Sequence, residues 1–415
     1  MRIAYITQSY PPMISGAALV AKNLSENMAT RGHKVLVITA SDRSESYKSA
    51  RDNLIILRLP SIHNPMRVGQ RFLLYPRHAV LKSLHDFQPD IIHVHEPLQM
   101  GMLGLEYAQR VNIPILLTIH QLPWFVSAYL PEISGVRAIA ETALWTYARW
   151  VLPKFTTMIA PTQTIANIIT NMTGTKSQTI SYGVDLQTFH PCRSLAEKSA
   201  TQTRLNLPPN VPILLHVGRL DTDKRVDQVI RASAQAMQKT DAHLLIVGDG
   251  HQRETLLQLC KSLGIGRRCH FPGYISVEEG LSDIYRMADL FVTASEIETQ
   301  GIVLLEAAAS GLPIAAVRAT CIPETVHGGV NGYLSEPNDT IALGRAITDL
   351  IMNPEKAEQM GKAGRRLMRE HNLVTIFDTY EHLYNDLLQK QTVKLTPEKI
   401  EFHSWQERAR EWLNL

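Results

Sequence analysis

The chain has 415 residues, of which 45% are hydrophobic and 20% charged, and its formal net charge is +3. This length favours two domains, the composition is typical of a soluble globular protein, and the small charge argues against a nucleic-acid partner. No stretch reaches the ~18 consecutive apolar residues of a membrane-spanning helix, and the four cysteines lack the CxxC spacing of a zinc site or disulfide framework. We therefore expect a cytoplasmic protein.

The first half of the chain alternates short apolar runs with helical segments. Each run is bounded by turn residues, as in strands that are buried on both faces of a parallel sheet. A helix over 18–31 separates the first two runs, and Gly32 follows its end. The alternation predicts a parallel sheet with right-handed crossovers. The predicted strands are 3–7, 34–39, 54–59, 91–95, 115–119 and 157–160.

The second half restarts this pattern after a polar, proline-containing break at 189–212. We predict an α/β protein with two Rossmann-like domains, 1–189 and 190–390, whose strand ends face each other across a cleft. The tail 396–415 is a predicted helix with one apolar face, expected to pack on the first domain or to touch a membrane. The strands expected here are 213–217, 243–247, 269–271, 290–293 and 314–316, and the helices are 227–237, 253–263 and 302–310.

Two carboxylates flank the start of the predicted helix 302–310. Glu298 precedes it and Glu306 lies about two turns along, so the pair can contact different parts of one extended ligand. Free backbone N–H groups at a helix start favour an anion such as a diphosphate. The alternative without a ligand is that Glu298 is an acid at the N-terminus of the helix and Glu306 a solvated glutamate. The residues expected to present these N–H groups are Thr299, Gln300, Gly301 and Ile302.

Two basic residues follow the strand 213–217. Arg219 and Lys224 could converge on phosphates and neutralise the charge of a leaving diphosphate, or could form an exposed basic loop.

Two other patterns could suggest a metal. The Asp221-Thr222-Asp223 triplet has no further acidic ligand near it in sequence, and His93-Val94-His95 has no evident third ligand. We therefore predict no metal site, and we expect His93 and His95 to be structural or to line the cleft. No GxGxxG follows the first strand, which argues against a dehydrogenase.

Together these segments resemble the motifs of glycosyltransferase family 4, in the family's order and over residues 1 to about 385. Glu298 and Glu306 reproduce its E-x7-E motif, and Gly218-Arg219-Leu220 with Lys224 resembles its GRL-and-lysine loop. Further matching segments are Val247-Gly248-Asp249-Gly250, Phe271-Pro272-Gly273-Tyr274, Tyr182-Gly183-Val184-Asp185 with Phe189, and Thr118-Ile119-His120.

The resemblance implies a GT-B fold and retaining transfer of a sugar from a nucleotide diphosphate donor, with no metal or other cofactor required. It implies that Arg219 and Lys224 hold the diphosphate, while Glu298 contacts the transferred sugar and Glu306 the ribose. The turn around Tyr274 would hold the base. His120 would lie near the reacting sugar, and Gly16 would let the N-terminal loop approach the phosphates.

The acceptor is expected on the first domain. Glu298-Thr299-Gln300-Gly301 resembles bacterial glycolipid-forming members such as diacylglycerol glucosyltransferases. No acid occurs between 53 and 85, where aromatic residues lie among cations, which suits an anionic lipid surface as well as an ordinary solvated basic face. Candidate acceptor or membrane residues are Arg67, Arg71, Trp124 and Phe125.

Three functions remain open from the sequence. The first is transfer of glucose from a UDP-sugar to a membrane lipid by an enzyme on the inner face of the membrane, with GDP and ADP as other possible donors. The second is transfer to a sugar, sugar phosphate or metabolite. The third is a catalytically silent GT-B subunit that binds a nucleotide or partner, which the presence of all four charged site residues disfavours.

Overall fold

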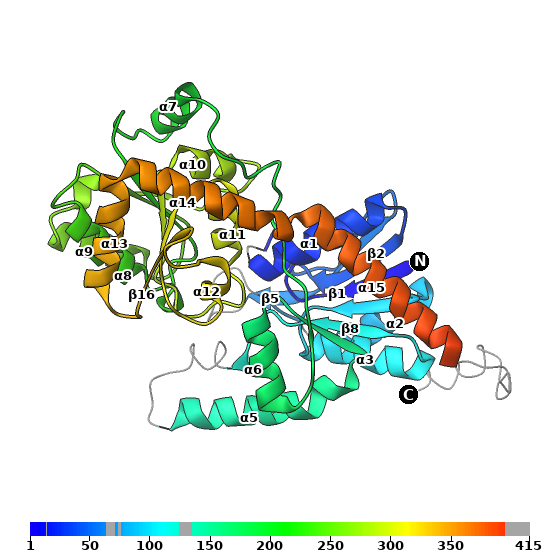
Figure 1. Ribbon diagram of the computed structural model, residues 1–415. Coiled ribbons are helices and arrows are strands. Elements are labelled where there is room, and N and C mark those ends of the chain that lie inside the picture. The colour runs from blue at the N-terminus through cyan, green and yellow to red at the C-terminus, as the bar shows by residue number, and fades with distance from the viewer. Residues whose placement is uncertain (14, 64–70, 74–75, 124–134, 395–415) are drawn as a thin grey trace, which may run out of the picture.

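The computed structural model describes residues 1–13, 15–63, 71–73, 76–123 and 135–394. It has two α/β domains, each built on a parallel sheet and flanked by helices (Figure 1). The predicted fold class is confirmed.

The first sheet has eight strands in the order β10-β9-β8-β7-β1-β2-β4-β3, and only β3 runs antiparallel to its neighbour. The strands are β1 Arg2–Ile6, β2 Lys34–Ala40, β3 Tyr47–Arg51, β4 Leu54–Leu59, β7 Ile91–Val94, β8 Ile115–Thr118, β9 Thr157–Ala160 and β10 Gln178–Thr179. A separate antiparallel pair joins β5 Ser61–His63 to β6 Arg71–Leu73.

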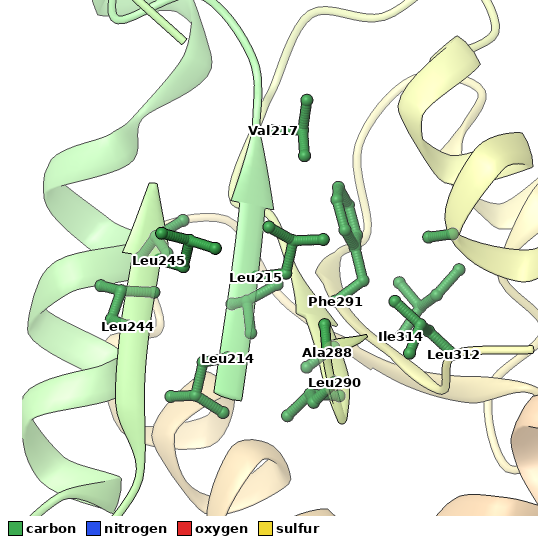
Figure 2. Close-up of a cluster of buried hydrophobic side chains, with 14 of the residues drawn as sticks. Leu214, Leu215, Val217, Leu244, Leu245, Ala288, Leu290, Phe291, Leu312 and Ile314 are labelled. Atoms are coloured by element: carbon green, nitrogen blue, oxygen red, sulfur yellow. The ribbon is translucent and has the colours of Figure 1, made fainter. Parts of the chain in front are cut away.

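The second sheet has six parallel strands in the order β13-β12-β11-β14-β15-β16. They are β11 Ile213–Val217, β12 His243–Val247, β13 Cys269–Gly273, β14 Leu290–Val292, β15 Ile314–Val317 and β16 Gly332–Ser335. Figure 2 shows Leu215 and Phe291 from the adjacent strands β11 and β14 within one apolar cluster. Burial on both faces explains why these strands read as continuous apolar runs.

Helices cover both sheets. In the first domain they are α1 Gly16–Thr30, α2 Arg77–Phe87, α3 Gln99–Val111, α5 Val136–Val151 and α6 Gln163–Thr173. Those that follow are α7 Leu195–Arg204, α8 Val226–Ala236, α9 Arg253–Ser262, α10 Leu281–Met287, α11 Ile302–Ala309, α12 Ile322–Thr325, α13 Thr340–Met352, α14 Pro354–Leu367 and α15 Leu373–Lys394.

The chain crosses between the domains twice, and the two crossings lie side by side. Val184 donates its N–H to the His371 carbonyl (2.8 Å) and accepts from the Leu373 N–H (3.1 Å). Gly183 has a φ of +76°, and a Cβ there would lie 2.9 Å from the Leu373 side chain. The paired crossings form the covalent connection between the two domains.

The last described helix corrects the predicted domain limits. We assigned residues up to 390 to the second domain, but α15 packs on the first sheet, where Phe377, Tyr380 and Tyr384 join its core (Figure 1). Its apolar side chains pack against Ile3 and Tyr5 of β1 and Ile91 of β7, a contact that a sequence pattern alone does not reveal. The predicted helix 396–415 lies outside the described residues.

Tight glycine packing holds the loop after β11. Gly248 has a φ of +141°, and a Cβ there would lie 1.9 Å from the Gly218 carbonyl oxygen. Gly248→Ala should therefore lower the free energy of unfolding by about 3 kcal/mol, measured by denaturant titration. Gly264→Ala is the control, because Gly264 has a φ of +71° but no atom near the added Cβ. Equal losses in both variants would contradict steric packing as the cause.

Candidate active site

A lysine–carboxylate pair lies where the loops after β11 and β14 meet. Lys224 ends the short 3-10 helix Thr222–Lys224, and its Nζ lies 2.6 Å from Glu298 Oε1. The side chains are only 16% and 14% exposed. Lys224 also lies 3.5 Å from Ser295 Oγ and from the Ile297 carbonyl oxygen. These three contacts hold the Lys224 side chain beside the start of α11.

The second predicted cation, Arg219, lies on the same loop. Its guanidinium pairs with Asp221 and, at 2.9 Å, with Asp223, whose carboxylate also lies 3.8 Å from Lys224 Nζ. The acidic triplet that might have suggested a metal therefore orients the two cations. Within the described ranges, no three His, Cys, Asp or Glu side chains are grouped to hold a metal ion.

The backbone of this loop is fixed by the neighbouring strand. Gly218 donates its N–H to the Val247 carbonyl (3.0 Å), and Leu220 donates to the Asp249 carbonyl (2.9 Å). A Cβ on Gly250 would lie 2.6 Å from the Leu220 carbonyl oxygen. The Val247-Gly248-Asp249-Gly250 segment thus supports the loop that carries Arg219 and Lys224.

Glu306 lies inside α11 and is almost fully buried. It accepts a hydrogen bond from the Tyr285 hydroxyl (2.8 Å), and burial raises the pKa of its carboxyl to about 7. Tyr274, which follows β13, is half exposed and close enough for Glu306 to help raise the pKa of its phenol, although burial is the larger cause. These two predicted residues therefore lie in one region beside α11.

The start of α11 meets the first domain. A Cβ on Gly16, the first residue of α1, would lie 3.3 Å from Ile302, the first residue of α11. The helix begins after Gly301, which has a φ of +74°. The Gly16–Ile302 contact therefore places the two helix starts next to each other, where the domains meet.

The side chain of Gln300 does not face that region. Its Oε1 accepts from the Tyr182 N–H (2.6 Å), and its Nε2 donates to Ser181 Oγ (2.7 Å). Thr162 Oγ1 donates to the Thr299 carbonyl (2.9 Å). The prediction for Gln300 concerned its backbone N–H and stays a prediction. Its side chain joins the loop 293–301 after β14, the predicted donor loop, to the interdomain crossing.

His120 lies just beyond β8, in a row of aromatic rings that reaches the donor loop. Its ring is parallel to that of Tyr182, with centroids 5.2 Å apart, and the Tyr182 hydroxyl lies 3.5 Å from Thr299 Oγ1. On its other side, His120 Nε2 lies 2.8 Å from His95 Nδ1. Burial holds the pKa of both imidazoles below the usual value, to about 3 for His95. Both rings are therefore neutral near pH 7.

The described cations between residues 53 and 85 contact other side chains of the first domain. Arg58 is 6% exposed, with its guanidinium over the rings of Tyr10 and Tyr47. Arg77 pairs with Glu106 (2.5 Å) and Lys82 with Asp86 (3.1 Å).

Arg71 also forms hydrogen bonds within the first domain. Its Nε donates to Ser61 Oγ at 2.7 Å, and its guanidinium also reaches the Ser61 carbonyl oxygen. The described cations of this stretch therefore each have a partner within the protein, and membrane contact through Arg71 stays a prediction. Arg67, Trp124 and Phe125 lie outside the described residues.

Two residues at the site were not predicted from the sequence. Tyr182 was noted only as part of a linker motif, yet it joins His120 to Thr299. Glu96 follows β7, accepts from the Gln8 N–H (3.0 Å) and has its pKa raised to about 7 by burial. A polar residue shortly after a buried strand was the available signal for Glu96. Tyr182 follows the exposed strand β10 by three residues, so that signal did not apply to it.

Comparison with known proteins supplies the remaining evidence. The model "Glycosyltransferase Family 4" matches residues 14–188 and "Glycosyl transferases group 1" matches residues 197–367. The alpha-monoglucosyldiacylglycerol synthase of Acholeplasma laidlawii is 25% identical over 405 residues, 95% of this chain and 99% of that protein. The N-acetyl-alpha-D-glucosaminyl L-malate synthase of Bacillus anthracis is 27% identical over 394 residues, 91% of this chain and 96% of that protein.

Solved structures share the fold. Sucrose-phosphate synthase from Thermosynechococcus elongatus superposes with a TM-score of 0.78 at 24% identity, over 94% of this chain and 99% of that one. Anabaena HepE in complex with UDP-glucose gives 0.73 at 21% identity, over 93% and 100%. The predicted GT-B architecture is confirmed. None of the helices in the described ranges is both long and apolar enough to cross a membrane.

Proposed function

Because the chain belongs to glycosyltransferase family 4 and is a hexosyl-transferring enzyme, we propose that it moves glucose from UDP-glucose to a hydroxyl of a membrane lipid such as diacylglycerol. The anomeric configuration is retained. The observation that carries the donor half of this proposal is the Lys224–Glu298 pair, 2.6 Å apart at the start of α11. On this proposal the lysine meets the phosphate and the carboxylate meets the sugar hydroxyls.

The proposed mechanism uses charge and position. The acceptor oxygen attacks the anomeric carbon on the face from which the diphosphate departs, and the acceptor proton passes to a diphosphate oxygen. No carboxylate nucleophile is needed, unlike in retaining glycosidases. Lys224, Arg219 and the N–H groups at the start of α11 stabilise the negative charge that develops on the diphosphate. Glu298 orients the sugar through its hydroxyls.

The donor assignment is supported by the fold relative HepE, which was solved with UDP-glucose. A thermal-shift series with UDP, GDP, ADP and their glucose conjugates tests it, because a ligand that binds only the folded state raises the midpoint. We expect UDP compounds to stabilise the protein and Arg219→Ala to remove the effect. No shift with any nucleotide would favour the silent-subunit alternative.

Donor affinity should depend on pH through Glu306. An ionised carboxylate accepts hydrogen bonds from ribose hydroxyls better than a protonated one, and burial raises its pKa to about 7. UDP-glucose affinity should therefore increase from about pH 6 to about pH 8 and then level off, measured by calorimetry. Glu306→Gln should flatten this dependence. An unchanged wild-type affinity across this range would contradict the role of Glu306.

The lipid acceptor is supported by the glycolipid synthase of Acholeplasma laidlawii and by an exposed apolar surface on α5. Ile139 and Trp150 on this helix are 72% and 55% exposed, while only Trp145 and Val151 are buried. Arg149 is exposed beside them although its Nε donates to the Met172 carbonyl oxygen (2.8 Å), and Lys154 Nζ lies 3.3 Å from the centroid of the Trp150 ring. Apolar side chains next to a cation suit peripheral contact with an anionic membrane. We propose that α5, rather than the basic stretch of β4 to α2, contributes the membrane-facing surface.

This membrane contact predicts a selective loss in vesicle binding. Ile139→Glu combined with Trp150→Glu should reduce co-sedimentation with anionic vesicles at low salt at least severalfold, because both apolar side chains are removed from the bilayer interface. Ile341→Glu is the control, since Ile341 is 55% exposed on α13 of the second domain. Equal vesicle binding by the double variant and the wild type would contradict α5 as the contact.

A small-molecule acceptor is the second candidate. It is favoured by the relative from Bacillus anthracis, which is named for transfer to L-malate. Product analysis with lipid and water-soluble acceptors side by side separates the two.

A further inference from the structure

His95 and His120 form a hydrogen-bonded pair that the proposed mechanism does not use. Their rings are nearly parallel, at 11°, with centroids 5.1 Å apart and His95 Nδ1 2.8 Å from His120 Nε2. Since both imidazoles are neutral, one of the two facing nitrogens carries a hydrogen and the other accepts it. The direction of this bond decides which nitrogen of His120 is a donor.

The other nitrogen of His95 indicates the direction. His95 is 1% exposed, and its Nε2 has no hydrogen-bond partner within the described part of the chain. A buried N–H without a partner is rarer and costs more than a buried lone pair. The hydrogen of His95 is therefore on Nδ1, where it can be donated to His120 Nε2.

The neighbouring ring of His93 provides no hydrogen-bond partner for His95 Nε2. His93 stacks on His95 with centroids 4.8 Å apart and has both nitrogens engaged, with Tyr384 and Thr118, each at 2.7 Å. The His93 ring is thus fixed and offers no free nitrogen. The His95 ring is held between the rings of His93 and His120, and among the described residues its side chain is hydrogen-bonded to His120 alone.

His120 lies between His95 and Tyr182 in this row. It is 9% exposed, in contrast to 1% for His95. If His95 donates to its Nε2, the hydrogen of His120 must be on Nδ1. The ring then offers an N–H donor to a ligand between the domains, next to Tyr182 and the donor loop.

We propose that His95 is a positioning residue that fixes the tautomer of His120, so that His120 presents a neutral Nδ1–H to a hydroxyl oxygen of the transferred sugar. The sugar contact rests on the proposed function, whereas the tautomer does not. A neutral donor orients the sugar without adding a positive charge next to the developing positive charge at the anomeric carbon. His120 on this view is neither a general base nor a cation.

Nitrogen-15 chemical shifts of histidine-labelled protein test the tautomer directly, because a protonated and a bare ring nitrogen resonate far apart. In the ligand-free protein, we expect His120 to carry its hydrogen on Nδ1, with the assignment made from a His120→Gln spectrum. His120 protonated on Nε2 would overturn the inference. An inactive protein with His120 protonated on Nδ1 would count against the proposed function alone.

Two variants test the consequence for transfer. His95→Phe keeps an aromatic ring but removes the donor, so kcat should fall about tenfold, the effect of one lost hydrogen bond, with little change in KM. His95→Asn replaces Nδ1–H with an amide N–H and should restore kcat. Wild-type kcat in His95→Phe, or equal losses in both variants, would overturn the inference.

The second domain contains a matched control. His243 Nδ1 lies 2.9 Å from His270 Nε2, with ring centroids 5.2 Å apart and an angle of 16°. His243 begins β12, at the opposite end of that strand from the loop that supports Arg219. His243→Phe should leave kcat unchanged. A loss of kcat as large as that in His95→Phe would overturn a specific role for His95.

Discussion

Replacing Lys224 with alanine should lower kcat by about 100- to 1,000-fold while the protein stays folded. The lysine is the cation placed at the start of α11, 16% exposed and 2.6 Å from Glu298, where it would meet the charge of the departing diphosphate. Because this charge develops in the transition state, kcat should fall more than donor affinity. Steady-state rates and donor dissociation constants measured on one preparation check both quantities.

Lys198→Ala is the matched control for this prediction. Lys198 also pairs with a carboxylate of the second domain, Asp289, at 2.5 Å and 23% exposure. Asp289 precedes β14, at the far end of the strand from the donor loop. Near-normal kcat in Lys224→Ala would contradict its assigned role, and a similar loss in Lys198→Ala would indicate general destabilisation.

Glu298→Gln should separate sugar recognition from nucleotide binding. The substitution keeps the size of the side chain but removes the charge that accepts hydrogen bonds from sugar hydroxyls. We expect kcat with UDP-glucose to fall about 100-fold, whereas UDP itself should bind at least as well as to the wild type. Calorimetry with UDP and rate measurements with UDP-glucose provide the two readouts.

The neighbouring carboxylate offers the control. Glu296 is on the same loop but pairs with Arg225 at 2.5 Å, away from Lys224. Glu296→Gln should keep kcat close to wild type. If Glu298→Gln lost UDP affinity in proportion to kcat, Glu298 would act on the nucleotide site rather than on the sugar.

The parallel strands could be predicted because their burial leaves a continuous apolar run. β11 and β12 match the predicted bounds, and all their residues but His243 are buried. β3 was missed because its Tyr47–Arg51 side chains are mostly exposed and carry no such run. The assignment of α15 to the first domain also depends on packing between residues far apart in sequence, as in the hydrogen bond between Tyr5 and Tyr384.

Site residues could be predicted where residue types suited to a ligand lie at a characteristic spacing within one segment of the sequence. Glu298 and Glu306 share one helix start, and the structure places Lys224 beside Glu298. The pairing of the cations between 53 and 85 could not be predicted, because an acid-free stretch of sequence does not exclude acids contributed by other segments. Arg77, for example, pairs with Glu106 of α3. The His95–His120 bond joins neighbouring strands through space, which spacing alone does not show.

The most direct test is a transfer assay of the purified protein with radiolabelled UDP-glucose, using diacylglycerol in anionic vesicles beside water-soluble acceptors. We predict label in a glucosyl lipid with the α-configuration of the donor retained, and no comparable product from the soluble acceptors. Label only in a soluble product would assign the acceptor to the small-molecule class, and an inverted anomer or no product from any UDP-sugar would contradict the proposed reaction.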